Sequence, residues 1–149
     1  MIIDKPKNHF NATIYSGNGS TQSIAGMDFG PEWVWIKQRN GTTDHILFDV
    51  IRGVYNNVKI NTTNAQAADN TQLTAFNSNG FSLGAEADGN ASGGTYVSYN
   101  WKAGGSGSNN TEGSQAATVS ANTTAGFSIV KIVKSGTSVV TVGHGLNTA

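Results

Sequence analysis

The chain has 149 residues with nine basic and nine acidic side chains, no cysteine and only 12% charged residues. The lack of cysteine excludes disulfides and thiolate metal sites, and the lack of a basic cluster argues against a nucleic-acid partner. No apolar run approaches the roughly 20 residues that a membrane span requires, so no membrane partner is expected.

Short runs of β-branched and aromatic residues, separated by Gly and Asn, predict an all-β chain. Strands are expected at Phe10–Tyr15, Thr21–Ile24, Glu32–Lys37, His45–Val50, Val58–Asn61, Phe81–Leu83, Thr95–Lys102, Ala117–Ala121, Phe127–Val133 and Ser138–Val142. Turn signals lie at Ser16–Gly19, Asn40-Gly41, Asn79-Gly80 and Ser135-Gly136, and Asn-Gly turns favour antiparallel pairing. The pattern predicts an antiparallel β-sandwich, jelly-roll or lectin-like, with Gly-rich loops.

Two of the expected strands are apolar on both faces. Trp33 and Trp35 share one side of their strand, while Val34 and Ile36 share the other. The strand 127–133 behaves similarly, with Ile129 and Val133 on one side and Val130 and Ile132 on the other. A strand of a plain two-layer sandwich has one polar face, so these strands predict an additional cover. A neighbouring subunit is one such cover, and we expect a homo-oligomer, with a trimer favoured.

Composition divides the chain into three parts. Residues 1–102 are expected to form the main sandwich body, and residues 103–113 an exposed Gly/Ser-rich loop or hinge with no apolar anchor. Residues 114–149 either complete the sandwich or open a second repeat, all within a single domain. At an offset of 117 positions, Phe10 matches Phe127, Gly19 matches Gly136 and Gly26 matches Gly143. The second copy of this pattern lacks the strand that follows in the first copy. We expect that strand to come from a continuation of the chain or from another chain.

Few residues suggest chemistry. Trp33, Trp35 and Trp101 are candidates for stacking on a glycan, although strand aromatics more often belong to a core. Glu86, Asp88 and Asn90 resemble half of a calcium loop, but a solvated turn is the stronger interpretation because no bidentate Glu follows. Asp49 with Arg52-Gly53 indicates a structural ion pair or strand terminator. No catalytic residue, metal site or cofactor is predicted.

Six segments, in order along nearly the whole chain, resemble a recurring domain of tailed-phage virion proteins. They are YSGNGSTQSIAG (15–26), FGPEWVWIK (29–37), HILFDVIRG (45–53), FNSNGFSLG (76–84), YVSYNWKAGG (96–105) and VSANTTAGFSIV (119–130). The resemblance implies a β-sandwich unit of tail-fibre-like or other structural proteins, and it carries no catalytic residues to this sequence.

These observations together predict a non-enzymatic virion structural protein at the particle surface, in a tail fibre or appendage. A contribution to host attachment is part of this expectation. Its partners would be other virion proteins. Two alternatives remain open: a capsid decoration protein, and a lectin-like carbohydrate-binding module that takes a host-surface glycan.

Overall fold

The computed structural model of the chain describes residues 5–134 and 136–146. Beside two single helical turns, η1 (Pro6–Asn8) and α1 (Ala87–Asn90), the regular elements described are strands. They are β1 (Phe10–Ser16), β2 (Gln22–Ala25), β3 (Trp33–Gln38), β4 (Ile46–Asp49), β5 (Asn56–Lys59), β6 (Ala67–Ala68), β7 (Leu73–Asn77), β8 (Gly80–Leu83), β9 (Thr95–Trp101), β10 (Ser108–Asn110), β11 (Ala117–Asn122) and β12 (Phe127–Ile132). No helix in the described part of the chain is long and apolar enough to cross a membrane.

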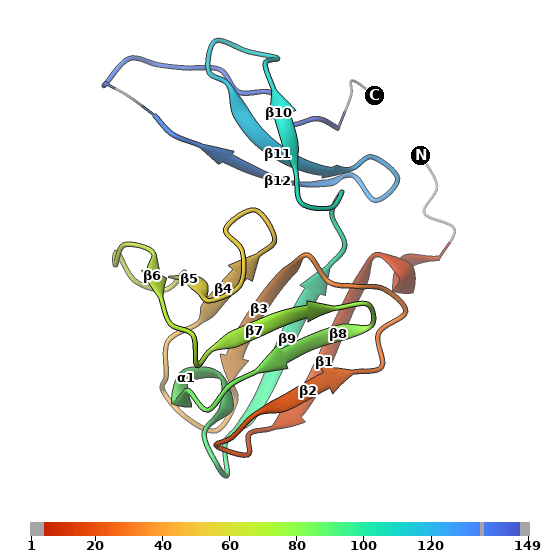
Figure 1. Cartoon of the computed structure of the whole chain (residues 1–149), viewed down its shortest axis with the longest axis vertical. Coiled ribbons are helices and arrows are strands. Elements are labelled where there is room, and N and C mark those ends of the chain that lie inside the picture. The colour runs from red at the N-terminus through yellow and green to blue at the C-terminus, as the bar shows by residue number, and fades with distance from the viewer. Residues whose placement is uncertain (1–4, 135, 147–149) are drawn as a thin grey trace.

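The strands form an antiparallel sandwich with a smaller sheet beyond one end (Figure 1). One layer of the sandwich is a six-stranded sheet with the order β1-β9-β3-β4-β5-β6, and the other is a three-stranded sheet with the order β2-β8-β7. The smaller sheet has the order β10-β11-β12. The predicted all-β antiparallel sandwich is confirmed.

The core lies between the two layers of the sandwich. Val34 and Ile36 on β3 and Phe48 on β4 are completely buried there, and they pack with Phe81 of the opposite sheet. Because side chains alternate along a strand, Trp33 and Trp35 lie on the other, outer face of the six-stranded sheet. The predicted division of β3 into two apolar faces is confirmed.

A glycine is needed where β7 turns into β8. A Cβ on Gly80 would lie 1.9 Å from the carbonyl oxygen of Ile24, so a side chain would push β2 away from β8. The Asn79-Gly80 turn signal is therefore confirmed. Its partner strand β7 was not expected, because Leu73–Asn77 mixes apolar and polar residues without a clear period.

The segment 103–113 is not the unanchored loop that its composition predicts. Ala103 is buried, and Ser120 fixes the backbone by accepting from the amide of Gly104 and donating to the carbonyl of Gly105. Ser108–Asn110 then forms β10, paired with β11. Backbone hydrogen bonds, which need no apolar side chain, order this segment.

The expected strand Ser138–Val142 is wrong. This segment lies beside residues 114–115, where Gln115 donates its amide to the carbonyl of Thr141, but it does not enter a ladder. The internal similarity is thus visible only in its first half: β1 and β12 begin at matching positions, and Gly19 and Gly136 both have a left-handed backbone, with φ of +67° and +78°. Ser135 of the predicted turn lies outside the described residues.

Within one chain, β12 is not covered by other residues on both of its faces. Ile129 is buried, but Val130 and Ile132 are each about 40% exposed, and Val133 beyond the strand end is 80% exposed. Val130 and Ile132, which share one face of β12, leave an apolar surface open on the smaller sheet, and Val133 adds an exposed apolar side chain on the other side.

Two tyrosines anchor the α1 end of the core. The rings of Tyr15 and Tyr96 are stacked with their centroids 5.2 Å apart. Their hydroxyls donate to the carbonyls of Gly89 and Ala87, respectively. Burial raises the pKa of both phenols, and the neighbouring Tyr96 raises the pKa of Tyr15 further.

This pair predicts a loss of stability in alkali. Tyrosines of the unfolded chain ionise at about pH 10, whereas Tyr15 and Tyr96 stay protonated at this pH while the chain is folded. A tyrosine whose pKa is higher in the folded state than in the unfolded state contributes its full stability at pH values below the unfolded pKa. This contribution is lost progressively as the pH rises from the unfolded pKa towards the folded pKa. We expect tyrosinate absorbance from these two residues to appear only with unfolding, and Tyr15→Phe to make the alkaline decline shallower. Simultaneous titration of all four tyrosines in a folded chain would contradict this.

Candidate functional site

Aromatic side chains form rows across the outer face of the six-stranded sheet. Strand register places Phe10, Trp101 and Trp33 side by side in one row, and Tyr99 and Trp35 in the next. The ring centroids of Phe10 and Trp101 are 4.8 Å apart, and those of Trp35 and Tyr99 are 5.2 Å apart. This face is therefore largely apolar although it lies outside the core.

Phe127 of β12 covers the first row. Its ring stacks on Trp101, with centroids 5.9 Å apart, and meets Trp33 edge-on at 6.0 Å. The row thus joins the sandwich to the smaller sheet. All three tryptophans are partly exposed, and neither the expected core role nor a fully open platform describes them.

An open pocket of about 270 Å³ lies at this junction. Its wall combines three aromatic rings with one histidine, one proline and two small residues: Pro6, His9, Phe10, Trp101, Ala125, Gly126 and Phe127. An apolar pocket with few polar groups is the usual form of a small-ligand site, although this one is slightly smaller than the usual range. Among the candidates Trp33, Trp35 and Trp101, only Trp101 lines it.

The polar group of the pocket, His9, has a defined tautomer. Asn122 accepts from the amide of Ala125 through Oδ1, so its Nδ2 is the donor, and it donates to the carbonyl of Lys102. The same Nδ2 lies 3.1 Å from Nδ1 of His9, which must therefore accept. In the neutral imidazole the proton of His9 then lies on Nε2, which can act as a donor.

Trp35 lies apart from this pocket. Its ring contacts Tyr99 and His45, at centroid distances of 5.2 and 5.9 Å, and its buried indole nitrogen has no hydrogen-bond partner in the structure. Trp35 is therefore a packing residue of the second row. The three candidate tryptophans do not form one shelf.

Phe10, Phe127 and His9 were missed as site residues by the sequence interpretation. A signal existed, because Phe10 and Phe127 occupy equivalent positions of the internal similarity, and both contact Trp101. What the sequence does not show is that two such phenylalanines flank the same tryptophan.

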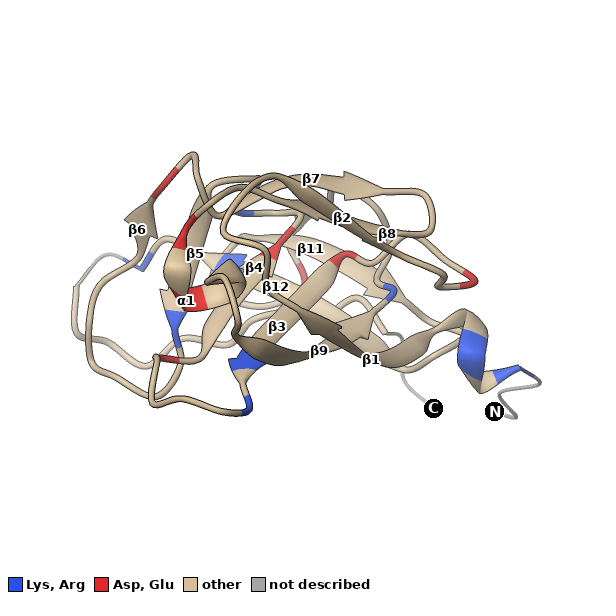
Figure 2. Ribbon diagram, turned by 90° about the horizontal axis from the view of Figure 1, so that it is seen from below, with Lys and Arg blue, Asp and Glu red and all other residues tan. Residues whose placement is uncertain are grey.

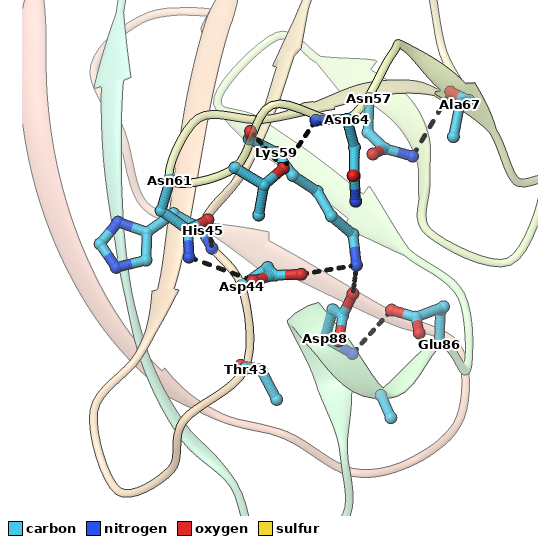
Figure 3. Close-up of polar contacts among 12 residues, drawn as sticks. Thr43, Asp44, His45, Asn57, Lys59, Asn61, Asn64, Ala67, Glu86 and Asp88 are labelled. Carbon is cyan, nitrogen blue, oxygen red and sulfur yellow. Dashed lines mark hydrogen bonds and ion pairs between the residues drawn. The ribbon is translucent and has the colours of Figure 1, made fainter.

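Charged side chains gather at a second place, beside α1 (Figure 3). Lys59 binds Asp44 at 2.9 Å and Asp88 at 3.0 Å, and Asn61 also donates to Asp44. Hydrogen bonds with the two carboxylates raise the pKa of Lys59 to about 12, and the bond with Lys59 lowers the pKa of Asp44. The amine is kept protonated, so it serves as an ion-pair partner and not as a nucleophile.

The half calcium loop is a helical turn with protein partners. Glu86 accepts from the amide of Asp88, which in turn pairs with Lys59. Asn90 is 1% exposed and donates to the carbonyls of Ser20 and Gly84. A solvated turn is therefore wrong as well, since Asn90 holds the loop after β1 to the one before α1. Within the described residues, no group of three His, Asp or Glu side chains could hold a metal ion.

Asp49 ends β4, as its pattern with Arg52 and Gly53 predicts. Its carboxylate is completely buried, accepts from the amides of Ile51 and Arg52, and forms an ion pair with the Arg52 side chain. Gly53 follows with φ of +83°, a conformation that glycine adopts without strain. The expected structural role is confirmed.

Comparison with known proteins gives one assignment. No curated protein and no solved structure matches the chain significantly. The model of one family, described as a domain of unknown function (DUF7483), matches residues 5–149. The chain therefore belongs to the DUF7483 family.

Proposed function

We propose that the chain is a non-enzymatic structural part of a tailed-phage particle, displayed at the virion surface in a tail fibre or appendage. The resemblance of its six segments to virion proteins supports this assignment. The structural observation that carries it is the open apolar face of the smaller sheet, where Val130 and Ile132 on β12 are each about 40% exposed. Exposed apolar patches of this kind mark contacts with other proteins.

The low charge of the chain supports the same function. Figure 2 shows Lys and Arg distributed together with Asp and Glu over the ribbon, without a large region of one sign. Many copies of a nearly neutral domain can pack closely, because their mutual repulsion is weak. The proposed partners are other virion proteins and further copies of this chain.

Immunogold labelling tests this proposal. An antibody against the purified chain is applied to particles from a phage whose genome encodes it, and gold confined to the tail or its fibres is the expected result. Gold spread over the head would favour the decoration alternative. An antibody that labels no part of the particles, while it detects the chain in the infected cells, would contradict a virion role.

A carbohydrate-binding function is favoured by a different observation, the aromatic pocket at Phe10, Trp101 and Phe127. Aromatic faces suit the apolar face of a sugar ring, and the Nε2 proton of His9 supplies a donor for a hydroxyl. Such a module would help a surface appendage to hold a host-surface glycan.

This function predicts that glycans change the tryptophan fluorescence of the chain. Bacterial surface oligosaccharides should quench it, and Phe10→Ala should weaken binding by about tenfold, since a lost aromatic contact is worth about 1.4 kcal/mol. Val130→Ala is the matched control, because Val130 is as exposed as Phe10 but lies outside the pocket. Equal binding by the wild type and Phe10→Ala would exclude this pocket as the glycan site.

A further inference from the structure

The three sheets end in six edge strands, and five of these have a feature that discourages pairing. β6 and β10 have only two and three residues, β2 has four, β7 contains a register shift, and β12 carries Lys131. β1 has none of these features. It has seven residues without a charge or a proline, in an unbroken register with β9.

The free backbone groups of β1 can be assigned from its ladder. The amide of Gly17 donates to Gly94, and the amide of Lys102 donates to His9, both in the register that pairs β1 with β9. Hydrogen-bonded pairs alternate along an antiparallel ladder, so the odd-numbered residues of β1 bond to β9. The amides and carbonyls of Phe10, Ala12, Ile14 and Ser16 therefore face outward from the sheet.

The same four residues place their side chains on the outer face. Ile14 is 68% exposed and Phe10 is 40% exposed, which is unusual for large apolar side chains on a strand. Ala12 lies between them and ends the row of Trp35 and Tyr99. A small residue there leaves space beside Tyr99 for an apolar side chain from outside.

We propose that β1 pairs antiparallel with β1 of a second copy of this chain, around a two-fold axis through Thr13. In this register Phe10 lies opposite Ser16 of the second copy, Ala12 opposite Ile14, and Thr13 opposite Thr13. Each outward amide of one β1 strand then lies opposite an outward carbonyl of the other strand. Because β1 lies at the edge of the six-stranded sheet (Figure 1), the sheets of the two copies become one continuous sheet.

A second copy is the occupant that the strand itself favours. The axis at Thr13 divides the seven residues evenly, so the strand is complementary to itself over its whole length. The ribbon of β1 carries no charge, so the two paired strands themselves bring no like charges together (Figure 2). Ile14 of the second copy would extend the apolar row of Trp35, Tyr99 and Ala12. This contact is two-fold, unlike the expected trimer, and it does not depend on the virion assignment.

A single cysteine at the axis tests the pairing. The chain has no native cysteine, so Thr13→Cys introduces a unique thiol. Opposite residues of a non-hydrogen-bonded antiparallel pair have Cα atoms about 4.5 Å apart, within the range of a disulfide. Mild oxidation of the purified chain should therefore convert Thr13→Cys into a covalent dimer, measured by electrophoresis without reductant.

Asn11→Cys is the matched control. Asn11 lies on the same strand and face with similar burial, but the proposed register places it opposite Tyr15 of the second copy. It should cross-link much more slowly. Equal rates for both variants, or a Thr13→Cys chain that remains monomeric after oxidation, would overturn the proposal.

Two further variants keep the test independent of any single substitution. Ala12→Cys and Ile14→Cys should cross-link with each other when mixed, and each much less with itself. Adding Ile14→Lys to Thr13→Cys should slow cross-linking by about tenfold, because it removes apolar contact and adds charge at the edge. Far-ultraviolet circular dichroism confirms that each variant is folded. A stable trimer of the wild type by light scattering, with no preference for Thr13→Cys, would also exclude two-fold pairing.

Discussion

Replacing Asp49 by alanine is expected to lower the free energy of unfolding by about 3–4 kcal/mol, since removing one partner of a buried ion pair leaves the other uncompensated. The Asp49 carboxylate is completely buried, and the Arg52 side chain is mostly buried. The substitution also leaves the amides of Ile51 and Arg52 without their acceptor. Urea unfolding followed by tryptophan fluorescence measures the change.

Two variants separate the ion pair from the turn. Asp49→Asn keeps an oxygen acceptor for the two amides but loses the charge, so it should cost about half as much as alanine. Asp69→Ala removes a similar turn, in which the carboxylate accepts from the amide and hydroxyl of Thr71, but Asp69 has no arginine partner. It should cost about 1 kcal/mol. A loss for Asp69→Ala as large as for Asp49→Ala would refute the importance of the ion pair.

Replacing Trp101 by alanine is expected to loosen the smaller sheet from the sandwich. Trp101 contacts both Phe10 and Phe127, so its removal opens the junction between the two parts. We expect a loss of about 2–3 kcal/mol, below the value for a fully buried tryptophan. Trypsin should cleave faster after Lys102, an exposed residue in the connection to β10.

Trp35→Ala is the matched control for this effect. Trp35 lies on the same sheet face and also packs on an aromatic neighbour, but it has no ring contact with β12. It should destabilise the sandwich without selectively raising cleavage after Lys102. If both variants accelerate that cleavage equally, Trp101 has no special role in joining the sheets.

Local signals were sufficient for much of the sandwich. The alternation of Trp33, Val34, Trp35 and Ile36 determines which side chains face the core, because successive side chains of a strand point to opposite faces. The Asn79-Gly80 turn is equally local, since Asn-Gly favours a tight hairpin, although the close approach of β2 that also requires this glycine is a long-range contact. Asp49 followed by Arg52 and Gly53 is a turn whose partners lie within four residues of one another.

Other features depend on neighbours that are distant in sequence. The two-residue β6 and three-residue β10 exist only because β5 and β11 offer them backbone partners, which no side-chain pattern records. Ser138–Val142 has strand-like residues but does not enter a ladder. Asn90 appeared to be a solvated turn residue, yet it is buried by contacts with Ser20 and Gly84.

The all-β class, most strands and the two apolar faces of β3 could be predicted from the sequence, since they follow from local periodicity and turn chemistry. Which aromatic side chains contact one another depends on long-range packing. Phe10, Trp101 and Phe127 come from three separate strands, and their pocket depends on the placement of the smaller sheet against the sandwich. The tertiary structure also determines that β1 ends a sheet, because strand order is set by long-range pairing and not by the residues of the strand itself.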